Sequence, residues 1–171
     1  QREGKPFALM AADLPTIARY AEVTNTERDL LTSAARPVVL LTMRPDAPVA
    51  PSVAPGRDRL GFMLPYTPLH HLLLEPGDGA PPALVMTSAN LSDEPIAHRN
   101  EEARRRLAPL ADRLLLHARR IHVRCDDSVT TSFRGAPYLL RRSRGYAPLP
   151  LELPFAAPQL LATGGELKNV F

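Results

Sequence analysis

One stretch of the chain decides its fold class: Leu84-Val85-Met86-Thr87-Ser88-Ala89-Asn90-Leu91-Ser92-Asp93-Glu94-Pro95-Ile96. Residues 83–86 are continuously apolar, which predicts a buried strand that ends in a polar loop. Hydroxyl and amide side chains follow at the carboxyl end of this strand, where open α/β sheets bind their ligands. These groups suit phosphate or carboxylate oxygens, although the same residue types also fill turns and cap helices.

Strands and helices alternate along the rest of the chain, which predicts an α/β sheet. Strands are expected at residues 5–10, 38–41, 60–65, 83–86, 113–116 and 121–123, with a hairpin over 133–140. Helices are expected at 13–22, capped by Asp13, from a cap at Thr26, at 67–74, capped by Thr67, and at 101–110, capped by Asn100.

The composition indicates a globular protein of one domain. The chain has 171 residues, of which 44% are apolar and 23% are charged. No apolar run approaches the roughly 20 residues of a membrane span, and the polar start argues against a signal peptide. Cys125 is the only cysteine, which excludes an internal disulfide and a cysteine-rich zinc site. A cytoplasmic location is therefore expected.

Three polar clusters are expected at strand ends and together could hold a nucleotide: residues 87–92, 126–128 and 141–146. Arg142 and Arg144 alternate on an extended chain, so both side chains would point the same way and could clamp neighbouring phosphates. An exposed basic edge strand is an equally good interpretation of these arginines. Asp126 or Asp127 could bind a ribose or Mg²⁺, although a simple turn also explains this pair.

Other nucleotide and metal signatures are absent from the sequence. There is neither a Walker A loop nor a GxGxxG fingerprint. His70 and His71 are adjacent, so on a helix they point about 100° apart and make a poor metal pair. His117 and His122 have no neighbouring cysteine or carboxylate cluster. No metal ligands are therefore expected in the chain, apart from Mg²⁺ that arrives with a nucleotide.

Five motifs then carry a family resemblance: residues 5–10 (KPFALM), 64–71 (LPYTPLHH), 86–96 (MTSANLSDEPI), 125–129 (CDDSV) and 141–148 (RRSRGYAP). In this order they resemble the YrdC-like domain of the HypF family of hydrogenase-maturation carbamoyltransferases. The resemblance implies a YrdC-like domain over residues 1–150 without its N-terminal strands. A Pro-rich linker would follow at 151–158, and residues 159–171 would begin the carbamoyl-transfer domain.

The resemblance also implies a fold and a reaction. The fold would be a twisted mixed sheet with flanking helices and an open, basic concave face that binds ATP. Carbamate from carbamoyl phosphate would attack the α-phosphate of ATP to form carbamoyl adenylate. The carbamoyl group would then pass to the C-terminal cysteine of the partner protein HypE, for the cyanide ligand of NiFe hydrogenase. Such in-line attack needs positioned cations rather than a protein nucleophile, so no catalytic residue is assigned.

Family positions transfer onto this sequence as expected phosphate-binding residues. The family's Ser-x-Asn pair falls on Ser88 and Asn90, and its basic residues fall on Arg2 and Lys5. A later serine falls on Ser128, and a late arginine on Arg141 or Arg142. Thr87 and Arg144 complete the set expected to bind nucleotide phosphates.

Three alternatives remain open from the sequence. The threonylcarbamoyl-adenylate synthases of tRNA modification and the antibiotic O-carbamoyltransferases share the YrdC-like fold. From a different class, the chain could be a non-catalytic module that binds double-stranded RNA, since its net charge is +3. Its few, scattered aromatic residues do not favour nucleic acid binding.

Overall fold

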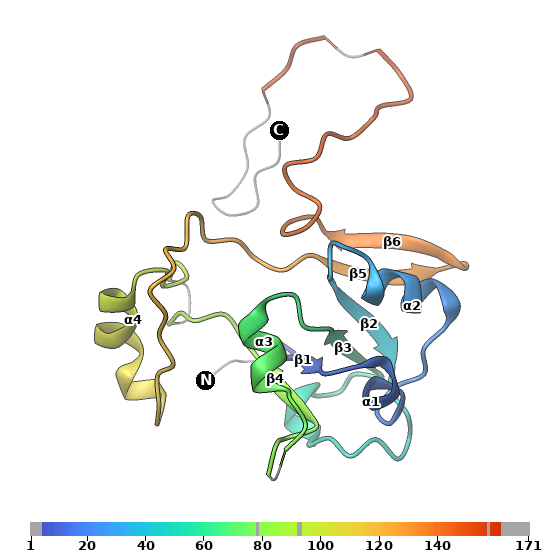
Figure 1. Ribbon diagram of the computed structural model, residues 1–171. Coiled ribbons are helices and arrows are strands. Elements are labelled where there is room, and N and C mark those ends of the chain that lie inside the picture. The colour runs from blue at the N-terminus through green and yellow to red at the C-terminus, as the bar shows by residue number, and fades with distance from the viewer. Residues whose placement is uncertain (1–4, 78, 92–93, 157, 162–171) are drawn as a thin grey trace.

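The computed structural model of the chain, which describes residues 5–77, 79–91, 94–156 and 158–161, contains one mixed sheet. Its six strands lie in the order β4–β1–β3–β2–β5–β6 (Figure 1). Neighbours β1 and β3 are parallel, as are β2 and β5, and the other neighbours are antiparallel. The strands are β1 Ala8–Ala11, β2 Val38–Thr42, β3 Arg59–Met63, β4 Ala83–Met86, β5 Val129–Phe133 and β6 Ala136–Arg141.

Helices lie on both sides of this sheet. In Figure 1, α1 and α2 lie on one side, α3 lies on the other, and α4 stands apart from the strands. The α-helices are α1 Leu14–Ala18, α2 Asn25–Thr32, α3 Pro68–Leu73 and α4 Asn100–Leu107, and the short 3-10 helices are η1 Pro51–Val53 and η2 Ala108–Leu110. The predicted α/β class with a mixed sheet is thereby confirmed.

The two faces of the sheet are covered to different extents. On the first face, Leu9, Val39 and Phe62 pack against Ile17 and Leu31 of the helices, and all of these side chains are buried. Successive strand residues point to opposite faces, so Met10, Val38 and Met63 belong to the second face, where Leu74 at the end of α3 packs on them. Ala8, Met86 and Val129 on that face are only partly buried. The second face is therefore the more open one.

The capping expectations were correct for two helices and wrong for two. Asp13 and Thr67 cap α1 and α3, each accepting a hydrogen bond from a backbone N–H three residues on. Thr24, not Thr26, caps α2, because Glu27 at the third helical position completes a capping box with Thr24. The hydroxyl of Thr26 instead donates to the carbonyl of Gly135, 2.8 Å away in the β5–β6 turn. Asn100 is the first residue of α4 rather than its cap.

Other expected boundaries were also wrong. Helix α1 stops at Ala18 rather than near residue 22, because Ala21 pairs with Met43 in an isolated antiparallel bridge. Helix α4 stops at Leu107, before Pro109, which disfavours a continuing helix. The strands expected at 113–116 and 121–123 do not form. No strand in the described part of the chain pairs with them, and most of the apolar side chains there are exposed.

Candidate functional site

The predicted polar clusters lie at opposite ends of the sheet. Ala8 pairs with Met86, so Lys5, which precedes β1, and residues 87–90, which follow β4, share one end. Strand β5 is antiparallel to β1 through the intervening pairings. Its start at residues 126–128, and the end of β6 at residues 141–144, therefore lie at the other end.

A single row of side chains runs across the strands on the open second face. Met86, Ala8, Gly61, Leu40 and Thr131 are aligned from β4 to β5 by the strand register. Two of these positions carry little or no side chain, so the middle of the row is shallow. A Cβ atom at Gly61 would lie 2.9 Å from the Val38 side chain, so this position is already closely packed.

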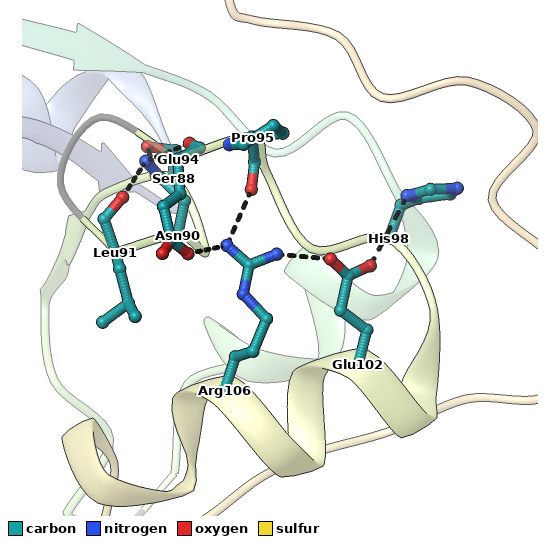
Figure 2. Close-up of polar contacts among 8 residues, drawn as sticks. All are labelled: Ser88, Asn90, Leu91, Glu94, Pro95, His98, Glu102 and Arg106. Carbon is teal, nitrogen blue, oxygen red and sulfur yellow. Dashed lines mark hydrogen bonds and ion pairs between the residues drawn. The ribbon is translucent and has the colours of Figure 1, made fainter.

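The turn after β4 is built by Asn90. Its side-chain amide donates to the carbonyl oxygens of Leu91 at 2.8 Å and Glu94 at 3.0 Å, while its oxygen accepts from the Ser88 hydroxyl (Figure 2). Asn90 is therefore committed to the shape of the turn. Ser88 and Thr87 are exposed beside it. Ser88 can exchange its internal hydrogen bond for one to a ligand oxygen at little cost, because hydroxyls rotate.

Arg106 of α4 fastens this turn to the helix. Its guanidinium binds the carboxylates of Glu94 and Glu102 and lies 3.4 Å from the carbonyl oxygen of Pro95 (Figure 2). The hydrogen bond from Arg106 lowers the pKa of Glu102. Sequence reasoning missed this role for Arg106, although the i, i+4 spacing of Glu102 and Arg106 is a recognisable ion-pair signal.

Ser128 fixes the main chain at the opposite end of the sheet. Its side chain is fully buried, donates to the carbonyl of Arg144 at 2.9 Å and accepts from the N–H of Ser143 at 2.7 Å. Both hydrogen-bonding functions of this hydroxyl are used by the chain itself. In this structure Ser128 holds the segment after β6 against the start of β5 and is closed to a ligand.

Arg144 makes the densest set of contacts at this end. Its guanidinium donates to Asp127 at 2.8 Å and to the carbonyl oxygens of Ala35 and Arg36 at 3.1 and 2.8 Å. It also lies over the Tyr66 ring, 3.5 Å from the ring centroid, where cation–π attraction adds to the hydrogen bonds. Arg144 and Asp127 therefore satisfy each other.

Arg142 points elsewhere than Arg144. It donates to the carbonyl oxygens of Tyr146, at 2.9 Å, and Leu149. A shared phosphate clamp of these two arginines stays a prediction, and it requires these contacts to open. Arg141, at the end of β6, is exposed and accessible to a ligand.

Tyr66 and His70 complete this end of the sheet, and sequence reasoning gave neither a role in it. The two rings meet edge to face with centroids 4.5 Å apart. Burial, followed by the charge of Asp127, raises the pKa of Tyr66. Burial, followed by the charge of Arg144, lowers the pKa of His70. The Nδ1 atom of His70 is buried without a hydrogen-bond partner among the described residues, which favours the neutral ring.

Two predicted site residues lie outside the described ranges, and the predictions about metal ions and membrane helices are tested only within those ranges. Arg2 and Ser92 fall outside the described ranges. Within those ranges, no group of three or more His, Cys, Asp or Glu side chains could hold a metal ion. None of the helices found there is long and apolar enough to cross a membrane.

Comparison with known proteins identifies relatives along nearly the whole chain. It is 46% identical to carbamoyltransferase HypF2 of Cupriavidus necator, over 99% of this chain and 23% of that protein. It is 44% identical to carbamoyltransferase HypF of Rhizobium leguminosarum, over 96% of this chain and 22% of that protein. The chain thus spans about a quarter of the length of these curated relatives, and the resemblance to HypF predicted from the motifs is confirmed.

Solved structures agree with this relationship. The crystal structure of full-length HypF in the phosphate- and nucleotide-bound form matches with a TM-score of 0.82 and 45% identity, over 90% of this chain and 24% of that chain. Escherichia coli YciO, at 22% identity and a TM-score of 0.66 over 82% of this chain and 67% of that chain, shares the fold. A family model described as "Telomere recombination", that of Sua5, YciO and YrdC, matches residues 1–143. The chain therefore belongs to the Sua5/YciO/YrdC family.

Proposed function

We propose that this chain is the nucleotide-binding, carbamoyl-adenylate-forming part of a carbamoyltransferase that uses ATP and carbamoyl phosphate. The observation that carries the proposal is its close match, in sequence and fold, to a HypF crystallised with phosphate and nucleotide. The HypF relatives are themselves named carbamoyltransferases. By the same relationship, the final acceptor of the carbamoyl group would be the C-terminal cysteine of HypE.

The nucleotide would lie across the open second face. Lys5 and Ser88 are exposed at one end of the sheet, where an ammonium and a hydroxyl can bind phosphate oxygens. Arg141, exposed at the other end, offers a guanidinium. Thr87 would add a second hydroxyl beside Ser88, while Asn90 would hold the turn that presents both. In this proposal Ser128, Arg142 and Arg144 shape the far end, and Arg142 binds phosphate only if its carbonyl contacts open.

The reaction would be an in-line displacement at the α-phosphate. Carbamoyl phosphate is first hydrolysed by water to carbamate and inorganic phosphate. An oxygen of carbamate then attacks the α-phosphorus, the bond to the bridging oxygen breaks, and pyrophosphate leaves with the bonding electron pair. The positive charges of Lys5 and the arginines would stabilise the negative charge on the phosphate oxygens.

Mg²⁺ would arrive with the nucleotide, since this ion is usually held by phosphates and one or two carboxylates. Asp127 is already paired with Arg144, so the partly buried Asp126 is the carboxylate we assign to the ion or to the ribose. This donor set fits an ion shared with ATP and is too small for a resident metal.

Isothermal titration of the chain with ATP and Mg²⁺ tests the proposal. We expect saturable binding that is weakened at least about tenfold in a Lys5→Ala, Ser88→Ala variant, because charge-assisted hydrogen bonds to phosphate are lost. A Ser52→Ala, Arg57→Ala variant is the matched control, since both residues are exposed in the loop between β2 and β3.

A second measurement tests the chemistry. Carbamoyl-phosphate-dependent exchange of labelled pyrophosphate into ATP should occur in the natural full-length protein and fall in the Lys5→Ala, Ser88→Ala variant. Exchange that depends on threonine and bicarbonate instead of carbamoyl phosphate would contradict the proposal in favour of a threonylcarbamoyl-adenylate synthase.

A further inference from the structure

A cavity of about 660 Å³ lies between α4 and the extended segment of residues 117–122. Its walls are joined where the side-chain amide of Asn100 donates to the carbonyl oxygen of His117, 2.9 Å away. The volume falls within the range of small-molecule sites, roughly 300–1,000 Å³. Its charged lining consists of Arg99, Arg105, Arg119, Arg120, Glu101 and Glu102, and histidines from both walls complete it.

The carboxylates of this lining are already paired with arginines that do not line the cavity. Glu102 is bound by Arg106, and Glu101 lies 3.8 Å from Arg104. The four lining arginines form no side-chain hydrogen bond or ion pair with any other described residue. The cavity therefore carries an excess of unpaired positive charge, and like charges gathered this closely favour an anionic ligand.

The number and type of these cations narrow the ligand class. A single carboxylate is satisfied by one bidentate guanidinium, whereas several phosphates in a row present enough oxygens for four. The lining arginines come from both walls, so a ligand with charges spaced along its length would contact both. Inorganic pyrophosphate and the triphosphate tail of a nucleotide meet this requirement.

In the sequence, the residues that line the cavity come after the Ser88 turn and before residues 124–128, which belong to the two ends of the candidate site. Its α4 wall is tied by Arg106 to Glu94 and Pro95, which follow the Ser88 turn (Figure 2). Its other wall leads directly into residues 124–128 at the opposite end of the sheet. We propose that the cavity binds a polyphosphate anion, either the phosphate tail of the nucleotide or the released pyrophosphate. This inference deepens the proposed function and rests on it for the source of the anion.

Titration with inorganic pyrophosphate tests the cavity directly, with an Arg119→Ala, Arg120→Ala variant and an Arg57→Ala, Arg113→Ala control. Both control arginines are exposed and outside the lining. Loss of two arginines should weaken pyrophosphate binding at least about tenfold, because charge-assisted contacts are lost. The control should bind like the unmodified chain. Circular dichroism melts establish that each variant is folded, and an Arg105→Gln variant on the other wall gives a second reading if the double variant unfolds.

Competition with ATP separates the two sources of the anion. If pyrophosphate displaces ATP but not AMP, and this competition is lost in the Arg119→Ala, Arg120→Ala variant, the cavity binds the phosphate tail of the nucleotide. Pyrophosphate that binds together with ATP assigns it to the free anion. Equal pyrophosphate affinity in all folded variants, or no binding by the folded chain, overturns the inference. Neither of these results changes the expectation that pyrophosphate exchange into ATP depends on carbamoyl phosphate. The experiments therefore distinguish failure of the inference about the cavity from failure of the proposed function.

Discussion

Gly145 is the residue at which the backbone is most constrained around the far end of the sheet. Its φ of +86° is in the left-handed region, and a Cβ atom there would lie 2.5 Å from the carbonyl oxygen of Ala35. Arg144 binds that same carbonyl oxygen, so the glycine lets this segment approach closely enough for the contact. A side chain at this position would push the segment away.

Gly145→Ala should therefore cost clearly more stability than the roughly 1–2 kcal/mol of left-handed strain alone. Gly79→Ala is the matched control, because Gly79 has a φ of +81° but no atom within 4 Å of its Cβ position. Urea denaturation of both variants gives the comparison. Equal losses of unfolding free energy in the two variants would mean that the contact with Ala35 relaxes freely.

His70 gives the same end of the sheet a dependence on pH. Its pKa is lowered from the ordinary 6.5 by burial and by the charge of Arg144. At a pH above the ordinary pKa of 6.5, the His70 ring is mostly neutral in both the folded and the unfolded chain. As the pH falls below it, the unfolded chain binds the proton more readily, so the unfolding free energy decreases until the pH passes the lower, folded pKa.

We expect His70→Gln to reduce the loss of stability between about pH 7 and about pH 5. Urea unfolding across this range measures the effect, and His71→Gln is the control because the neighbouring side chain is exposed. An unchanged pH profile in the His70→Gln variant would show that protonation of His70 is not linked to folding. The carboxylates contribute equally to the parent and variant profiles and cancel in their difference.

Helix α2 shows how two threonines, two residues apart, serve different elements. Thr24 caps the helix through a capping box with Glu27. Thr26, which is inside the helix, binds Gly135 in the turn between β5 and β6. The first contact stabilises the start of α2, and the second joins α2 to the hairpin.

Thr24→Ala should lower the unfolding free energy by about 1 kcal/mol, the usual value of an N-cap. Thr26→Ala should lower the unfolding free energy by about 0.5–1.5 kcal/mol, the usual net contribution of one hydrogen bond. It should also accelerate amide exchange in the β5–β6 turn, which Thr24→Ala should leave unchanged. If Thr24→Ala instead accelerated exchange in this turn and Thr26→Ala did not, the assignment of Thr24 as the helix cap would be contradicted.

Features that depend on residues close together in the sequence were predictable, whereas features that depend on distant partners were not. Thr67 and Asp13 were predictable because a cap depends on residues only three positions apart. The strands expected at residues 113–116 and 121–123 had the right apolar pattern but lacked a partner strand, which a sequence pattern does not show. The ring of Tyr66 under Arg144 joins residues far apart in the chain, so no local signal could reveal it.

At the scale of the whole molecule, the polar clusters were predictable but their relative positions were not. The clusters that begin at Thr87 and at Arg141 follow a strand, as the patterns indicated. Residues 126–128 instead precede β5, because the strand expected before them at 121–123 does not form. The separation of the clusters depends on strand order and direction, because β5 is antiparallel to β1 and the clusters face opposite ends of the sheet. The family motifs carried the fold class and the resemblance to HypF, since they match long stretches rather than single residues.

This arrangement makes a prediction about how the whole sheet responds to a nucleotide. Without ligand, backbone amides in the central strands β1, β3 and β2 should exchange slowest, because they lie in the middle of the sheet and in its buried core. Residues 111–123 should exchange quickly, because they form no helix or strand and are mostly exposed.

Addition of ATP with Mg²⁺ should slow exchange at both ends of the sheet, around residues 87–91 and 124–128, since a nucleotide across the open face would order both. Hydrogen exchange read by mass spectrometry resolves the two regions, and AMP is the informative comparison. If AMP protects one end and ATP protects that end together with the walls of the α4 cavity, the AMP part and the β- and γ-phosphates occupy separate parts of the molecule. Protection at only one end with ATP would confine the ligand there and contradict a site that spans the sheet.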